Sequence, residues 1–170
     1  MQDSAVDFVT GYRDTLFGGA PAVLLTSREI VNRVPNSTGL VQRRNLTATL
    51  GLIRQLQPDV RQVFVVSGAA RSDGEYEDEL RRQFPQSDAQ LAVTYLSGLA
   101  TAELERRLSQ LPEHSAVYHL PDSADGAGST FRPLEDVDRV AAAANAPTYS
   151  WVDSTLGHGI VGGSLTARRP

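Results

Sequence analysis

The run Gln62-Val-Phe-Val-Val-Ser-Gly-Ala-Ala70 decides the fold class, because an apolar, β-branched segment passes directly into small residues and then into a helical pattern. The apolar face of that helical pattern consists of Tyr76, Leu80 and Phe84. Residues four apart lie on one side of a helix, so this face predicts a helix with Ser72 or Asp73 as its N-cap. The segment therefore reads as a buried strand, a short turn and a helix.

The same alternation of strand and helix continues towards the C-terminus. Further strands are predicted at Leu91–Leu96, Ser115–Leu120 and Pro147–Trp151. The intervening helices are indicated by Leu104, Leu108 and Leu111, and by Pro133, which suits the first helical position. Continuous apolar strands that alternate with helices indicate an α/β fold, in which a parallel sheet carries helices on both faces. Right-handed crossovers favour the flavodoxin-like strand order 2-1-3-4, with Val63–Ser67 as strand 1.

The N-terminal part of the chain adds one more helix and strand. Asp7–Phe17 predicts a helix with one apolar face, formed by Phe8, Val9, Tyr12 and Leu16, and Pro21–Thr26 predicts a short buried strand. Val34–Gly39 is rich in breakers and marks the predicted boundary, after which a helical pattern runs from Leu46 to Pro58. We therefore expect residues 1–35 to form one part, residues 36–156 an α/β ligand-binding lobe, and residues 157–170 a return segment and tail.

Composition excludes several classes of protein. The chain has 170 residues, 41% of them apolar, and a net charge of −4, which gives no field that would attract nucleic acid. It contains neither cysteine nor lysine, so thiolate, iron–sulfur, P-loop and Schiff-base chemistry are excluded. No apolar run is long enough to span a membrane, and the first residues lack a signal pattern, as in a cytosolic protein or a piece of a longer chain.

The predicted topology locates a candidate binding site. Ligands of open α/β sheets bind beyond the carboxyl ends of the strands, so the loops Ser67–Glu75, Pro121–Arg132 and Val152–Gly162 are the relevant ones. From these loops and the adjoining strand ends we select as candidate ligand-binding residues Ser67, Gly68, Ala69, Asp73, Asp122, Asp125, Arg132, Trp151, Asp153 and Thr155.

The residue types in these loops favour a neutral or zwitterionic ligand. Ser67-Gly68 before a helix resembles a turn that cradles an anion, but Asp73 and Glu75 at the helix start would repel a phosphate. Trp151 is suited to stack on a flat or apolar group, and Asp153 to accept from an amine or hydroxyl. Simple turn chemistry remains the alternative for each of these residues.

Metal binding and hydrolysis are weaker interpretations. His119, Asp122, Asp125, Asp153 and His158 are metal-ligand types, but none of the spacings is H-x-x-x-H, and a histidine within a strand is more often a core residue. A Ser67–His119–Asp triad lacks the G-x-S-x-G pattern. We therefore expect no metal, no cofactor and no catalytic residue.

Several blocks of the chain occur in the order found in a known family. The blocks are Asn45–Leu50, Leu56–Asp59, Val63–Gly68, Asp125–Gly128, Phe131–Pro133, Ala141–Pro147 and Val161–Gly163. Together they resemble the ABC-type substrate-binding-like sensor region of proteobacterial sensor histidine kinases.

The resemblance implies one lobe of a periplasmic binding protein. In that family two α/β lobes enclose a ligand cleft in the periplasm, ahead of a membrane span and a kinase. Asp7–Thr26 matches the end of the first lobe, whose earlier units are missing. The hinges would lie near Val34–Gly39 and Gly157–Gly163, as extended crossings at the rim of the sheet, and closure of the lobes would carry the signal.

Two functions therefore stay open. The first is a non-enzymatic sensing or solute-binding lobe for a small molecule such as an amino acid or an aromatic acid, whose exposed apolar surface would also allow a homodimer. The second is a stand-alone flavodoxin-like enzyme or nucleotide-binding module that depends on His119 or Asp122.

Overall fold

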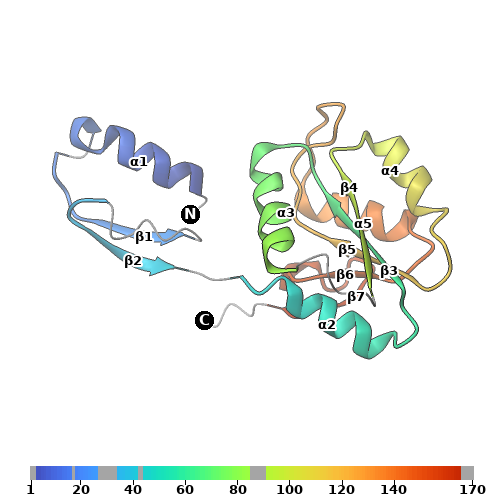
Figure 1. Cartoon of the computed structure of the whole chain (residues 1–170). Helices are drawn as coiled ribbons and strands as arrows, with labels where there is room; N and C mark the ends of the chain where they lie inside the picture. The colour runs from blue at the N-terminus through green and yellow to red at the C-terminus, as the bar shows by residue number, and fades with distance from the viewer. Residues whose placement is uncertain (1–2, 17, 27–33, 42–43, 85–90, 166–170) are drawn as a thin grey trace. The chain divides into compact units, whose positions relative to one another are not determined.

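The computed structural model describes residues 3–16, 18–26, 34–41, 44–84 and 91–165, and it divides into two compact units. The N-terminal unit is Met1–Arg44 and the C-terminal unit is Asn45–Pro170 (Figure 1). Among the described residues, no helix has both the length and the apolar character needed to cross a membrane.

The C-terminal unit alternates strands and helices along most of its length. Its helices are α2 (Thr47–Leu56), α3 (Arg71–Gln83), α4 (Thr101–Leu108), α5 (Pro133–Ala143) and the short 3₁₀ turn η2 (Asp153–Thr155). Its strands are β3 (Gln62–Ser67), β4 (Ala92–Ser97), β5 (Ser115–His119), β6 (Thr148–Ser150) and β7 (Ile160–Gly162).

The five strands form one parallel sheet in the order β4-β3-β5-β6-β7. This confirms the expected α/β class, and the first four strands follow the flavodoxin-like order 2-1-3-4. The strand β7 at the edge was missed, because three residues that include a glycine carry too little apolar pattern to stand out from the surrounding turn. Residues 157–170 therefore supply a sheet strand and are not only a tail.

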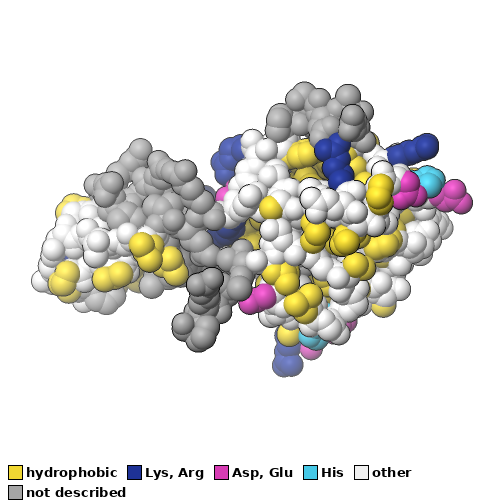
Figure 2. All heavy atoms as spheres, turned by 90° about the horizontal axis from the view of Figure 1, so that it is seen from below, with side chains coloured by type: hydrophobic (Ala, Val, Ile, Leu, Met, Phe, Trp, Pro, Cys, Tyr) yellow, Lys and Arg dark blue, Asp and Glu magenta, His cyan; other side chains and the backbone are white. Residues whose placement is uncertain are grey.

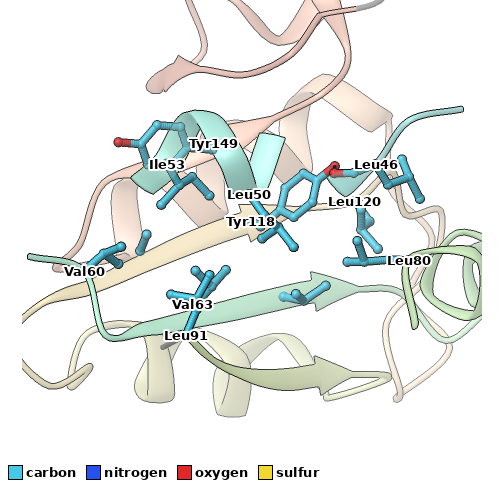
Figure 3. Close-up of a cluster of buried hydrophobic side chains, with 12 residues drawn as sticks. Leu46, Leu50, Ile53, Val60, Val63, Leu80, Leu91, Tyr118, Leu120 and Tyr149 are labelled. Atoms are coloured by element: carbon cyan, nitrogen blue, oxygen red, sulfur yellow. Dashed lines mark hydrogen bonds between the residues drawn. The ribbon is translucent and has the colours of Figure 1, made fainter. Parts of the chain in front are cut away.

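Helices cover both faces of this sheet. On β3 and β5 successive side chains alternate between the two faces, as the period of a strand requires. One face packs against α2 and α3 in a cluster of twelve buried residues that includes Leu50, Ile53, Val63, Leu80 and Tyr118 (Figure 3). The opposite face packs against α4 and α5 and includes Val66, Leu104, Leu108, Val117 and Val140.

Tyr118 is one of two tyrosines in the first cluster. It is fully buried, and its hydroxyl donates a hydrogen bond of 3.1 Å to the carbonyl of Leu46 just before α2. Burial raises the pKa of the Tyr118 hydroxyl well above its usual value of 10.0. The bond thus fixes the start of α2 to the centre of the sheet.

The N-terminal unit contains α1 (Asp3–Leu16) and two parallel strands, β1 (Ala22–Thr26) and β2 (Ser37–Val41). Arg13 in α1 is buried, and its guanidinium donates to the carbonyls of Ala20, Pro35 and Asn36. This buried arginine ties the helix to the turns that precede both strands.

The boundary between the units lies at Arg44–Asn45, whereas the sequence placed it at residues 35 and 36. The reason is that β2 pairs in full register with β1, so residues 37–41 belong to the N-terminal unit. The expected hinge segments Val34–Gly39 and Gly157–Gly163 each begin as a turn and continue into a strand, β2 or β7, so neither lies in a helix.

Two local expectations also change. The N-cap of α3 is Ala70 and not Ser72 or Asp73, while Pro133 does begin α5 as expected. The predicted apolar face of α1 is largely exposed, since Phe8, Tyr12 and Leu16 are each at least half accessible. Figure 2 shows apolar side chains at the surface of both units.

Candidate functional site

The carboxyl edge of the five-stranded sheet brings two of the predicted loops together. Because the strands are parallel, the loops after β3 and β5 leave the sheet at the same edge. The Ala69 amide donates to the carbonyl of Ala124 at 2.7 Å, and the Ser123 amide donates to Asp73 Oδ2 at 3.0 Å. The two loops are therefore hydrogen-bonded to each other, as their position in the topology led us to expect.

Gly68 stands where these loops come closest. A Cβ atom at this position would lie 2.3 Å from Asp73 Oδ2, 2.6 Å from Asp122 Cβ and 2.8 Å from the Ala124 carbonyl oxygen. Real side chains do not tolerate such distances, so only glycine allows the loops to meet here. The glycine that suggested an anion cradle thus serves the packing of the two loops.

Asp73 joins the same two loops through its carboxylate. It is 3% exposed and accepts hydrogen bonds from the Ala70 amide, the Ser72 hydroxyl, and both the amide and the hydroxyl of Ser123. These donors take up both carboxylate oxygens. Asp73 therefore acts as a structural clamp at the start of α3, and the amides of Ala69 and Ala70 that would face an anion are already engaged.

Asp125 is a second clamp at this edge. One carboxylate oxygen accepts from the amide and the hydroxyl of Thr101, and the other accepts from the amides of Ala127 and Ser129. The N-cap residue of α4, Ala100, has no side chain that can cap, so Asp125 caps this helix from a distant loop. The Thr101 hydroxyl and the backbone donors lower the pKa of Asp125 to about 2.

Ser67 belongs to a hydrogen-bond network with Glu77 of α3 and Ser97 of β4. Its hydroxyl donates to Glu77 Oε2 at 2.5 Å, and Ser97 on β4 donates to the same oxygen. Burial would raise the pKa of Glu77, but the hydrogen bonds from Ser67, Ser97 and Arg81 outweigh it and lower the pKa. Because Ser67 bonds Glu77 and His119 bonds Asp136, the Ser67–His119 pair of the hydrolase hypothesis is not formed.

Three other candidates have simple surroundings. Thr155 is buried and donates to the carbonyl of Val152, within the turn η2 that Asp153 begins. Arg132 is exposed, with Nη1 3.7 Å from Glu135 Oε1. The contact with Glu135 leaves the Arg132 guanidinium accessible to solvent.

Trp151 follows the end of β6 and packs against Tyr76 of α3, with ring centroids 5.8 Å apart. Its indole Nε1 is shielded from solvent and has no hydrogen-bond partner. A buried N–H donor without a partner costs about 1–3 kcal/mol, so Trp151 Nε1 is an unsatisfied donor beneath the surface of this edge.

Asp122 belongs to a buried polar group that the sequence did not assemble. The members are His119 at the end of β5, Asp122 in the following loop, and Asp136 in the first turn of α5. His119 Nε2 lies 3.0 Å from Asp136 Oδ2, and Arg139 bonds the other oxygen of Asp136. The sequence did not indicate Asp136 as a partner of His119, because no spacing links the two residues.

The two carboxyl groups of this cluster titrate very differently. Burial, together with the hydrogen bond and the charge of Asp136, raises the pKa of Asp122 from 3.8 to about 8. Burial acts in the same sense on Asp136, but hydrogen bonds from His119 and Asp122 and the charge of Arg139 prevail and lower the pKa of Asp136. At neutral pH Asp122 therefore holds a proton and Asp136 is ionised.

The other metal-ligand types of the sequence lie elsewhere. Asp125 is occupied by the donors of its own loop and α4, and His158 pairs with Asp138 at 2.8 Å. The cluster at the end of β5 thus contains His119 and Asp122 from the original set and gains Asp136.

No family model and no curated protein matches this chain. Two solved structures share its fold. A conserved domain protein from Vibrio cholerae O1 biovar eltor matches 94% of this chain and 62% of its own length, with a TM-score of 0.55 and 16% identity. The ABC domain from Streptococcus pneumonia, in complex with L-Trp, matches 84% of this chain and 50% of its own length, with a TM-score of 0.54 and 16% identity.

These likenesses establish a periplasmic-binding-like α/β fold. The C-terminal unit is too short to account for a match over 94% of the chain, so the first likeness includes residues of the N-terminal unit. The chain spans less than two thirds of either solved structure.

Proposed function

We propose that this chain is part of a two-lobed protein that binds a small molecule without transforming it. The ligand contacts the carboxyl edge of the five-stranded sheet and reaches the indole N–H of Trp151, which without a ligand is shielded from solvent and unpartnered. The observation that carries the proposal is the fold itself: the match extends over both units of this chain, yet both matched chains are considerably longer.

An amino acid or an aromatic acid is the ligand class that fits best. The Streptococcus pneumonia ABC domain was solved in complex with L-Trp, and an aromatic group can stack on the Trp151 side of this edge while its polar end accepts from Nε1. The carboxylates of Asp73 and Asp125 already accept hydrogen bonds at both oxygens, so they make poor partners for a ligand amine. Asp153 and Arg132 remain the charged candidates for contact with the ligand.

The wider context of the proposal is a periplasmic sensor of a two-component histidine kinase, in which closure of two lobes signals across the membrane. The blocks of sequence that resemble such sensor regions support it. The gene on either side of this segment provides the direct check, because a sensor requires preceding βα units, a membrane helix and a kinase.

Ligand binding can be tested with the full-length protein by isothermal titration with L-Trp, L-Phe, L-Tyr and indole-3-acetate. Trp151→Phe keeps an aromatic ring but removes the N–H donor, so we expect the affinity to fall by about tenfold, equivalent to one hydrogen bond of ~1.4 kcal/mol. Asp59→Asn, at the opposite edge of the sheet where Asp59 pairs with His114, is the control and should leave affinity unchanged.

Equal affinity of wild-type and Trp151→Phe proteins would place the ligand away from this edge. No binding of any compound in the panel would reject the amino-acid and aromatic-acid class. Turnover of a substrate that is abolished by His119→Gln would instead favour the enzyme hypothesis.

A further inference from the structure

The ligand-binding proposal makes no use of the side chains of His119, Asp122 and Asp136, which form a buried cluster. Their exposed fractions are 2%, 7% and 1%. Each residue offers one ligand atom, and these three atoms all lie within 4.8 Å of one another. Three metal-ligand side chains from a strand end, a loop and a helix start therefore converge inside the C-terminal unit.

Their spacing suits a coordinated ion. Zn²⁺ binds imidazole nitrogen and carboxylate oxygen at about 2.0–2.2 Å, so donors around one ion lie roughly 3–4 Å apart. The three donor atoms of this cluster, all within 4.8 Å of one another, are close to this spacing. One imidazole with two carboxylates is a donor set that suits Zn²⁺, and three protein ligands leave one position for water or another ligand.

Two atoms of the cluster have unused bonding capacity. His119 Nδ1 and Asp122 Oδ1 are both shielded from solvent and lack a hydrogen-bond partner, although both side chains are more than nine-tenths buried. Buried polar atoms are nearly always satisfied in folded proteins, so two such atoms in one cluster call for a specific explanation. A bound ion accounts for Asp122 Oδ1, because coordination uses its free lone pair, and it also fixes the orientation of the imidazole.

The local charge also leaves room for a divalent cation. Asp73 and Asp136 both lie close enough to Asp122 to act on its charge, and Arg139 is the cation of this group. When all three carboxyls are ionised, they exceed the single guanidinium by two negative charges. Two carboxyl groups in contact inside a protein must share either a proton or a cation.

We propose that His119, Asp122 and Asp136 bind one divalent metal ion, with Zn²⁺ the best fit to the donor set. Because the ligands come from β5, the loop after it and α5, the bound ion fastens the start of α5 to the end of β5.

The experiment uses the purified chain, stripped with EDTA, exchanged into chelator-free buffer and titrated with ZnCl₂ by calorimetry and by equilibrium dialysis with metal analysis. We expect one ion per chain and a rise in melting temperature. Uptake below half an ion per chain at saturating ZnCl₂ would overturn the proposal.

Asp122→Asn is the decisive variant. Its amide N–H₂ can donate to Asp136 as the protonated carboxyl does, so the fold should persist while Zn²⁺ affinity falls by at least tenfold. Asp138→Asn carries the same substitution on the exposed side of α5, where Asp138 pairs with His158, and should bind Zn²⁺ like the wild type. Wild-type affinity in Asp122→Asn would refute the assignment.

A spectroscopic measurement on the wild-type chain covers the case in which Asp122→Asn fails to fold. Co²⁺ bound by one nitrogen and two oxygen ligands in a four-coordinate site gives visible absorption bands of high intensity, whereas aqueous Co²⁺ gives weak ones. Appearance of the intense bands at one equivalent of Co²⁺, and their loss on addition of Zn²⁺, supports the site. A spectrum identical to aqueous Co²⁺ contradicts it.

Discussion

Replacing Asp122 by Asn is expected to flatten the pH dependence of stability between pH 5 and 7. In the folded protein the pKa of Asp122 is raised to about 8, mainly by burial and by the neighbouring Asp136 carboxylate. In the unfolded chain the group returns to about 3.9. Between these two values the folded state keeps a proton that the unfolded state has released.

The size and the sign of the effect follow from proton linkage. The free energy of unfolding falls by about 1.4 kcal/mol for each pH unit over which one extra proton is bound in the folded state. The stabilisation from this proton is complete below the unfolded pKa and is lost as pH rises through the folded value of about 8. Raising the pH from 5 to 7 should therefore cost the wild type up to roughly 3 kcal/mol at this site, and Asp122→Asn nothing.

The assay is urea unfolding at half-unit pH steps from 5 to 7, with EDTA present so that no bound ion replaces the proton. Trp151 is the only tryptophan and lies in the C-terminal unit, so its fluorescence reports on the unit that contains Asp122. The titration of Asp136 lies below this window, because its pKa is lowered. Parallel stability curves for the wild type and the variant would refute the assignment of the proton to Asp122.

Three further substitutions test the loops and the core, and urea midpoints measure each of them. Gly68→Ala should destabilise the protein by about 1–3 kcal/mol, because its Cβ would overlap Asp73 and Asp122. The control Gly74→Ala, with open space around it, should be neutral or stabilising, and equal effects of the two variants would contradict the close approach of the loops. Asp125→Asn should lower the urea midpoint at pH 7. Because the pKa of Asp125 is lowered to about 2, the variant should also lose less stability than the wild type as pH falls from 4 towards 2. An unchanged acid transition would argue against the cap of α4. Tyr118→Phe should cost about 1 kcal/mol through the lost bond to Leu46, and no loss relative to the exposed control Tyr12→Phe would mean that this bond contributes nothing.

The strands of the C-terminal unit were predictable because their apolar character is local. Gln62–Ser67 and Ser115–His119 lie in the interior of the sheet, and their central residues, Val63–Val66 and Ala116–Tyr118, are all apolar. Such a run is visible without knowledge of its neighbours. β2 and β7 lack this signal. Ser37–Val41 and Ile160–Gly162 contain glycine and few apolar residues, and they become strands through pairing with β1 and β6.

The candidate site was predictable only as a region. Parallel strands and right-handed crossovers place the loops after β3 and β5 at one edge, and the two loops do meet there. A side chain can contact a ligand only if no other residue already occupies it, and the occupying residues are distant in the sequence. They are Thr101 for Asp125, Ser123 for Asp73 and Glu77 for Ser67. Composition of the loops could not distinguish these clamps from ligand-binding groups, because both use small polar residues.

The sequence by itself determined the α/β class, the strand order of the central sheet and the edge at which function should be sought, since apolar periodicity and crossover handedness act over short stretches of chain. The tertiary structure decided the chemistry at that edge. His119 and Asp136 are brought together by a loop whose path no periodicity encodes. The burial of Asp122 and its contact with Asp136 raise the pKa of Asp122. Side-chain partners are set by distances of a few ångströms between segments, and such distances exist only once the sheet and its helices have packed.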